Sequence, residues 1–219
     1  MGSPPTPRAL LGDPDREAYA RGYGRVCGVD EVGRGSLAGP VVAAAVILPP
    51  GAEIAGLDDS KRLTPRARGE LVPRIREIAV AVALGVAGPG EIDRLNIHRA
   101  TLAAMVRAVE ALPVAPDLLL VDGVHRLPLD LPQETLVGGD GRSLAIAAAS
   151  VIAKEHRDAL MAAFGREYPG YGFERHKGYP TAAHREALRR LGPCPIHRVS
   201  FRGVREPSPP PAQPPLFPS

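Results

Sequence analysis

The stretch Arg25–Leu48, RVCGVDEVGRGSLAGPVVAAAVIL, contains two short apolar runs separated by a glycine-rich turn. Both runs, Arg25–Asp30 and Val41–Leu48, are bounded by glycine or proline, which is typical of buried strands. Asp30 ends the first run, and Glu31 follows it directly. This stretch therefore predicts two neighbouring strands of a sheet with carboxylates at a strand end.

Further strands and helices alternate along the chain on either side of this core. Three more strands are expected where apolar or β-branched residues form short runs, at Ile78–Val86, Leu118–Asp122 and Thr135–Val137. Helices are expected from capping residues and apolar residues at helical spacing, beginning at Thr64-Pro65 and covering Ile97–Leu112, Ser143–Phe164 and Thr181–Leu191. This order predicts an α/β fold with a mixed sheet flanked by helices, in which the first three strands form an antiparallel meander. The last helix and the segment after it form a small helical C-terminal extension.

The 219 residues fit one domain of ordinary size. Residues 1–18 are rich in proline and charge, and we expect a disordered N-terminal extension there. Residues 206–219 lack too many backbone donors to form helix or sheet, so a disordered Pro-rich tail is expected. The domain itself is expected at residues 19–205.

Composition excludes several classes of protein. No apolar run reaches the roughly 18 residues that a membrane span needs, and the first residues lack the pattern of a signal peptide. We therefore expect a cytoplasmic protein without a membrane partner. Cys27 and Cys194 show no metal-finger spacing. Between Glu174 and Arg205, eight lysines and arginines stand against two glutamates. This excess favours a polyanion partner, although an arginine-rich solvated surface would have the same composition.

Four acidic residues lie at predicted strand ends or in glycine-rich turns: Asp30, Glu31, Asp122 and Asp140. Oxygen ligands of this kind suit Mg²⁺, and two ions roughly 3.5–4 Å apart can promote phosphodiester hydrolysis. Because successive strand side chains face opposite ways, Asp30 and Glu31 could serve one site only if the backbone turns there. Acids at strand ends are common turn formers, so Asp122 or Asp140 alone would not indicate a metal site.

The turn Gly33-Arg34-Gly35 directly follows the acidic pair. Glycine lets a backbone approach a ligand closely, and free amides in such a turn can donate to sugar or phosphate oxygens. Arg34 offers a fork of donors for phosphate. A plain tight turn would have the same sequence, so this motif is weak evidence by itself.

These residues together resemble the signature of the bacterial ribonuclease HII family, the type 2 ribonucleases H. The similarity continues in family order over residues 24–203, through DDSKRL, LNIHRATL, VDG, GGD, AAASVIAKEHRD and YGFERHKGYPTAAHREAL. The resemblance implies a ribonuclease H-like fold and a monomeric endonuclease that requires Mn²⁺ or Mg²⁺. Its substrates would be RNA–DNA hybrids and duplex DNA with single embedded ribonucleotides, which it would nick on the 5′ side. Cleavage would leave a 3′-hydroxyl and a 5′-phosphate and would serve ribonucleotide removal from DNA.

The resemblance also implies roles for individual residues. Asp30, Glu31 and Asp122 would be metal ligands, and Asp140 would complete the acidic cluster. The backbone of Gly33, Arg34 and Gly35, together with Tyr179, would address the 2′-hydroxyl that separates RNA from DNA; Tyr171 is the alternative tyrosine. Candidate phosphate contacts are Ser60, Lys61, Lys154, Arg157 and Lys177. Lys154 and Arg157 could equally face solvent, and structural roles are favoured for the histidines.

Two other functions are compatible with parts of this pattern. A non-catalytic nucleic-acid-binding module would explain the basic C-terminal third, but clustered acids without metal would repel phosphate. Another metal nuclease on the same fold, of the resolvase or transposase type, would explain the acids but not the GRG and HKGY motifs.

Overall fold

The computed structural model describes residues 13–57 and 63–205. The Pro-rich tail and the first part of the expected N-terminal extension lie outside the described residues, as do Ser60 and Lys61. Within the described part of the chain, no helix is long and apolar enough to cross a membrane.

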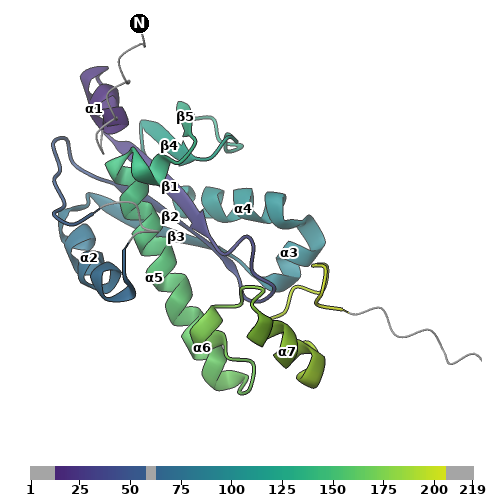
Figure 1. Cartoon of the computed structure of the whole chain (residues 1–219). Coiled ribbons are helices and arrows are strands. Elements are labelled where there is room, and N and C mark those ends of the chain that lie inside the picture. Colours follow the sequence, from purple (N-terminus) through teal and green to yellow (C-terminus); the bar gives the residue numbers. More distant parts are fainter. Residues whose placement is uncertain (1–12, 58–62, 206–219) are drawn as a thin grey trace, which may run out of the picture.

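Five strands form one mixed sheet in the order β3-β2-β1-β4-β5 (Figure 1). The strands are β1 (Val26–Val32), β2 (Val41–Ile47), β3 (Ala81–Ala87), β4 (Leu118–Asp122) and β5 (Gln133–Leu136). β2 pairs antiparallel with both β1 and β3, whereas β4 pairs parallel with both β1 and β5. The predicted meander and the mixed sheet are therefore confirmed.

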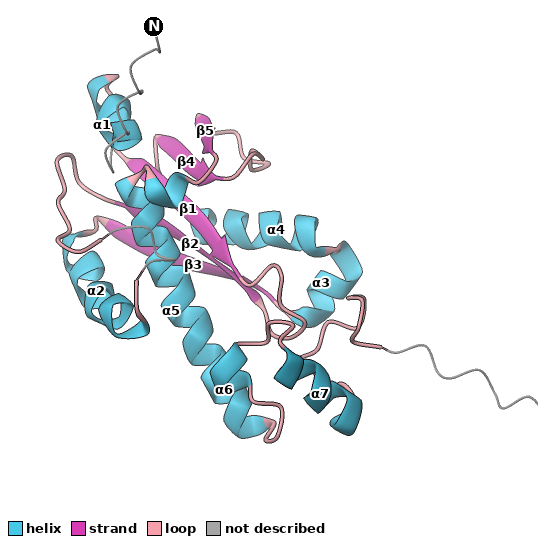
Figure 2. Ribbon diagram, viewed as in Figure 1, coloured by secondary structure: helices cyan, strands magenta, loops and turns pink. Residues whose placement is uncertain are grey.

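Helices cover both faces of this sheet, and this is why its strand β2 is apolar and buried at every position. Alternate residues of β2 enter two different cores, Ala43 and Ile47 one of them and Val42 and Val46 the other. Figure 2 shows the helices in two layers, with α2 and α5 on one side of the sheet and α3 and α4 on the other. Their bounds are α2 Pro65–Ile78, α3 Pro89–Leu95, α4 Ile97–Glu110 and α5 Leu144–Glu167.

The prediction of disorder through residue 18 is wrong for its last part, because Asp13–Ala20 forms helix α1. Asp15 in this helix is buried, and its carboxylate accepts hydrogen bonds from the Ser143 hydroxyl and the Leu144 amide at the start of α5. The short helix is thus held by a contact with a segment far away in the chain. Such a contact has no local sequence signal.

Several boundaries also differ from the sequence-based expectation. α2 continues to Ile78, so β3 begins only at Ala81. β5 begins two residues earlier and ends one residue earlier than expected, at Gln133–Leu136. The short helix α3 was not expected, because its seven residues are too few to show helical periodicity.

The predicted helical C-terminal extension packs against the end of α5 (Figure 1). It contains α6 (Phe173–His176), which was not expected, and α7 (Ala182–Leu191). Phe173 and Ile196 form a small core with Met161 of α5. This core attaches the basic segment of the chain to the sheet domain.

Two buried histidines, His184 and His197, join α7 to the last part of the chain through their Nε2 atoms, which lie 3.0 Å apart. His184 Nδ1 is 3.0 Å from the Tyr179 carbonyl and donates to it, so the Nε2 atom of neutral His184 accepts from His197. Burial lowers the pKa of both histidines, that of His197 to about 4. Both rings are therefore neutral in the folded protein at neutral pH, in keeping with the structural role expected for histidines.

This histidine pair makes the protein sensitive to acid. The unfolded chain binds protons at a pKa of about 6.5, and the folded His197 only at about 4, so the stabilisation is complete above about pH 6.5 and decreases as the pH falls towards 4. We expect thermal unfolding measured between pH 8 and pH 4 to show a falling midpoint over this range. In His197→Gln the fall should be shallower, and identical slopes in the two proteins would contradict this assignment.

Candidate active site

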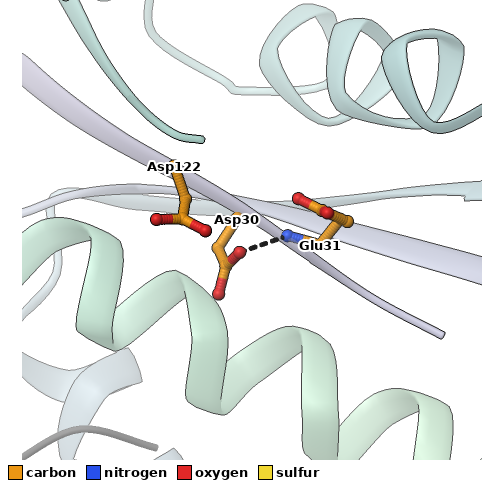
Figure 3. Close-up of side chains that lie close together, drawn as sticks. All are labelled: Asp30, Glu31 and Asp122. Carbon is orange, nitrogen blue, oxygen red and sulfur yellow. Dashed lines mark hydrogen bonds between the residues drawn. The ribbon is translucent and has the colours of Figure 1, made fainter. Parts of the chain in front are cut away.

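Three carboxylates lie at one end of the two neighbouring strands β1 and β4 (Figure 3). The parallel pairing of Val29 with Val121 places Asp30 and Asp122, one residue further on, at the same end of the sheet. Oxygen atoms of Asp30, Glu31 and Asp122 lie within 4.8 Å of one another. Parallel pairing of two distant segments therefore brings the acids together.

Glu31 joins this group although β1 continues as a strand through Val32. The backbone turn that was expected at the acidic pair begins only after Val32. The Glu31 side chain reaches the group from the strand end, and its own amide donates to Asp30 Oδ1 at 2.7 Å.

Burial and mutual repulsion make this group of acids a good fit for a cation. The pKa of Asp30 lies well above its usual range because the carboxyl is buried and then because Glu31 and Asp122 are nearby. Burial also raises the pKa of Glu31, and the Arg34 guanidinium, at 3.2 Å, opposes this shift. All the candidate ligands are oxygens, which hard divalent ions prefer. A bound divalent cation would remove the repulsion that raises these pKa values.

Asp140, the fourth acid that the sequence singled out, is not a member of the group of acids that lie within 4.8 Å of one another in the described part of the chain. It is buried in the single 3-10 turn Gly139–Gly141. The turn supports the group in another way, because the Gly139 amide donates to Asp122 Oδ1 at 2.7 Å.

A cavity of about 440 Å³ opens over the acids, and its lining combines most of the residues that the sequence singled out. The lining consists of Asp30, Glu31, Val32, Gly33, Arg34, Gly35, Arg68, Asp122, Ser150, Lys154 and Tyr179. Sequence reasoning missed Arg68 and Ser150. Arg68 lies in α2, outside the quoted motifs, whereas Ser150 lies inside AAASVIAKEHRD, where its hydrogen bond to Asp30 could have been considered.

The two candidate tyrosines have different surroundings. Tyr179 lines the cavity that contains the acids. Tyr171 is buried in the core of the C-terminal extension, stacks on Phe173, and donates its hydroxyl to the Gly192 carbonyl at 2.7 Å. This arrangement favours Tyr179 as the tyrosine that meets a substrate.

The candidate phosphate contacts also differ in whether they line this cavity. Lys154 lines the cavity and pairs with Asp158 at 2.6 Å. Lys177 is not among the lining residues, and its Nζ lies 3.4 Å from the Asp158 carbonyl. Both expectations for Arg157, a phosphate contact or a solvent-facing side chain, are wrong, because its side chain is fully buried and donates to backbone carbonyls.

A second cavity, of about 210 Å³, shares Glu31, Arg34 and Asp122 with the first. It adds His98 and His125, whose ring centres are 4.4 Å apart. The acids therefore lie on a groove that continues beyond the first cavity. Such a groove suits an extended substrate better than a small molecule.

Gly33 occupies a backbone position that other residues rarely adopt, with φ of +97°. A Cβ at this position would overlap Nε of Arg157. We expect Gly33→Ala to lower the free energy of unfolding by about 2 kcal/mol. The matched control is Gly35→Ala, because a Cβ at Gly35 meets nothing within 4 Å. Denaturant titration should show a much smaller loss for the control, and equal losses would contradict the assigned strain.

The fold and the site define a class of protein before any relative is considered: nucleases with a ribonuclease H-like mixed sheet and an acidic metal site at its strand ends. A model of the family Ribonuclease HII matches residues 27–204. Ribonuclease HII of Geobacter sulfurreducens is 55% identical over 200 residues, which cover 91% of this chain and 92% of the relative. The crystal structure of ribonuclease H2 from Pyrococcus horikoshii superimposes with a TM-score of 0.70 at 26% identity, over 82% of this chain and 95% of that chain.

The chain therefore belongs to the ribonuclease HII family. It is a hydrolase, an endoribonuclease that acts on RNA–DNA hybrids. The family assignment decides against a non-catalytic binding module and against a resolvase-type nuclease.

Proposed function

We propose that this enzyme also nicks duplex DNA on the 5′ side of single embedded ribonucleotides, by two-metal-ion catalysis that leaves a 3′-hydroxyl and a 5′-phosphate. One observation carries the proposal: the three carboxylates, the Gly33–Gly35 turn and Tyr179 line a single cavity. The proposed metal ligands and the groups that could hydrogen-bond a ribose hydroxyl thus line the same cavity. Removal of ribonucleotides from DNA would be the biological role.

Asp30, Glu31 and Asp122 would hold the metal, with Asp140 as a fourth acid supported by its place next to Gly139, whose amide contacts Asp122. Mn²⁺ or Mg²⁺, when bound, would make an attacking water more acidic and would stabilise charge on the leaving 3′-oxygen. The protein itself would supply the fixed ligands. Its buried Asp30 would keep solvent from one side of the group.

The Gly33–Gly35 backbone and Tyr179 would read the 2′-hydroxyl, because a site that hydrogen-bonds a hydroxyl strongly rejects the analogue that lacks it. Arg34 is exposed at the edge of the cavity, where its guanidinium can meet a phosphate. Lys154 would contact a neighbouring phosphate. Lys177, Ser60 and Lys61 are proposed as further phosphate contacts from their motifs alone.

The basic C-terminal third offers a surface for the flanking duplex. Four arginines line a groove of about 840 Å³ that no carboxylate of residues 13–57 or 63–205 lines, namely Arg185, Arg189, Arg202 and Arg205. Leu188 and Val204, which also line it, pack on Leu37 two residues after the Gly33–Gly35 turn. The arginines thus lie behind the proposed sugar-reading turn, which supports their interaction with phosphates of the same duplex. We propose a monomer that acts in the cytoplasm, where such DNA would be found.

Cleavage of three matched duplexes tests this function: one of DNA only, one with a single ribonucleotide and one RNA–DNA hybrid. With Mg²⁺ or Mn²⁺ present, we expect cutting of the last two and one nick 5′ of the ribonucleotide. The upstream product should be extendable by a DNA polymerase, which requires a 3′-hydroxyl. Chelation with EDTA should abolish cutting and added metal should restore it. Equal cutting of the all-DNA duplex, or no nick at the single ribonucleotide, would refute the proposed specificity.

A further inference from the structure

Two arginine side chains next to the active-site cavity are completely buried: Arg157 of α5 and Arg198 of the C-terminal segment. No carboxylate among the described residues lies within ion-pair distance of either guanidinium, in contrast to Arg68, which pairs with Glu155 and Asp158. Backbone carbonyl oxygens accept hydrogen bonds from their guanidinium N–H groups instead. Both side chains therefore act on the conformation of the backbone around them.

Arg198 binds the turn that follows the acidic strand. It donates to the Gly33 carbonyl at 2.7 Å and to the Arg34 carbonyl at 2.9 Å. Two further hydrogen bonds, of 3.0 Å and 2.8 Å, go to the Gly39 carbonyl. One guanidinium thus connects both ends of the loop that carries the proposed sugar-reading amides.

Arg157 connects the same loop with the segment that carries Tyr179. It donates to the carbonyls of Pro40 and Ala38 at 2.9 Å and 3.2 Å, and to the Lys177 carbonyl at 3.0 Å. Its guanidinium carbon also lies 5.5 Å from the centre of the Tyr179 ring. One side chain therefore contacts both halves of the proposed sugar-reading site.

Burying these charges is energetically unfavourable. Burial lowers the pKa of both arginines, and that of Arg198 falls to about 9, with nearby Arg157 as a further cause. Both remain cations at neutral pH, and removing an unpaired cation from water is expensive unless strong dipoles replace the water. The loop carbonyls supply these dipoles and are themselves satisfied, since a buried carbonyl needs a donor. The result is a loop whose conformation depends on the two planar guanidinium groups.

We propose that Arg157 and Arg198 are positioning residues that hold the Gly33–Gly35 turn and Tyr179 at a fixed separation, so that recognition of an embedded ribonucleotide depends on them. The inference rests on the proposed function, in which these two elements read the 2′-hydroxyl. Neither arginine contacts the substrate. Both determine specificity through the backbone and the ring that they hold.

Arg198→Lys and Arg157→Lys test this role, because lysine keeps a positive charge but cannot donate to several carbonyls in fixed directions. Arg107→Lys is the matched control: Arg107 also donates to a carbonyl, that of Val86, and to Glu91, but it lies outside both cavities that contain the acids. Each protein is examined for its circular dichroism spectrum, its rise in melting temperature on addition of Mn²⁺, and kcat and KM on the single-ribonucleotide duplex and the hybrid.

Both lysine variants should keep the parental fold and the parental response to Mn²⁺. Their kcat on the single-ribonucleotide duplex should fall about 10-fold or more, since small errors in position reduce rates steeply, with a smaller fall on the hybrid. Arg107→Lys should lose stability without a change in the ratio of the two activities. A lysine variant with the parental ratio would overturn the proposal, and so would failure of both variants to fold, which would make the arginines determinants of folding only.

A double-mutant cycle separates this inference from the proposed function. If Arg157 acts through the Tyr179 ring, then Arg157→Lys should add little to the loss already caused by Tyr179→Ala, which removes that ring. Fully multiplicative losses would show that Arg157 acts elsewhere and would refute its positioning role. A Tyr179→Ala protein that cuts the single-ribonucleotide duplex like the parent would instead contradict the proposed function.

Discussion

Asp30→Asn is expected to reduce cleavage of both ribonucleotide-containing duplexes by about 1000-fold, equivalent to ~4 kcal/mol of transition-state stabilisation. Asp30 is the most buried member of the acidic group, and an oxygen of its carboxylate lies within 4.8 Å of carboxylate oxygens of Glu31 and Asp122. Asparagine has the same shape and can still accept the hydrogen bond from the Glu31 amide. The change therefore removes one negative charge from the metal site with little disturbance of its geometry.

The same substitution should stabilise the protein when no metal is present. Burial and two neighbouring carboxylates oppose ionisation of Asp30, so the folded protein without metal carries unfavourable electrostatic energy there. Removing the charge should raise the free energy of unfolding by about 1 kcal/mol. Function and stability would then change in opposite directions at this residue, which is the pattern expected of a site built for a cation.

Melting temperatures with and without Mn²⁺, measured beside the cleavage rates, check both parts of this prediction. Mn²⁺ should raise the melting temperature of the parent more than that of Asp30→Asn, because a ligand stabilises only the folded state that binds it. Asp130→Asn, at an exposed position between β4 and β5, is the control and should match the parent. An Asp30→Asn protein with parental cleavage would exclude Asp30 as a metal ligand.

Tyr179→Ala is expected to reduce nicking at a single ribonucleotide by about 100-fold, or ~3 kcal/mol, while the stabilisation by Mn²⁺ stays unchanged. Tyr179 lines the cavity over the acids but is not one of them, so its loss should affect sugar recognition and leave the metal site intact. Tyr179→Phe separates the two parts of the side chain. A loss already present in the phenylalanine variant would assign the effect to the hydroxyl group.

Tyr171→Phe is the matched control for this experiment. It removes a hydroxyl that donates to Gly192 inside the C-terminal core. We expect about 1 kcal/mol lower stability and parental cleavage of all three duplexes. If Tyr171→Phe lost nicking activity and Tyr179→Phe kept it, the assignment of the two tyrosines would be reversed.

Much of the sheet could be predicted from the chain around Asp30. The run that becomes β2 is apolar at every position because helices cover both faces, and β1 is apolar as far as Asp30. Glycine and proline mark the ends of both runs. The first residues of helices could also be predicted where a side chain caps its own helix, as Thr64 and Thr181 do. α1 escaped prediction because it is held by Asp15 binding the start of α5, a contact across more than a hundred residues.

The candidate site was only partly predictable. The motifs identified Asp30, Glu31, Asp122 and Tyr179, which the structure places around one cavity. They could not show that Asp140 lies outside the group of three acids or that Arg68 lines the cavity. The first depends on the shape of one turn and the second on the packing of α2 against α5, and neither follows from residue type.

Sequence patterns that span only a few residues were thus enough to predict the strands of the meander, the capped helices and the acids at strand ends. Helix capping and the periodicity of buried side chains both act over that short range. Only the tertiary structure decided that β1 lies beside β4, so that Asp122 lies close to Asp30. It also decided that the buried Arg157 side chain donates to backbone carbonyls of a loop and does not serve as a phosphate contact. The physical reason is the same in each case. Hydrogen bonds and burial between segments far apart in the chain leave no trace in local composition, and an arginine has the same place in a motif whether its donors meet phosphate or backbone carbonyls.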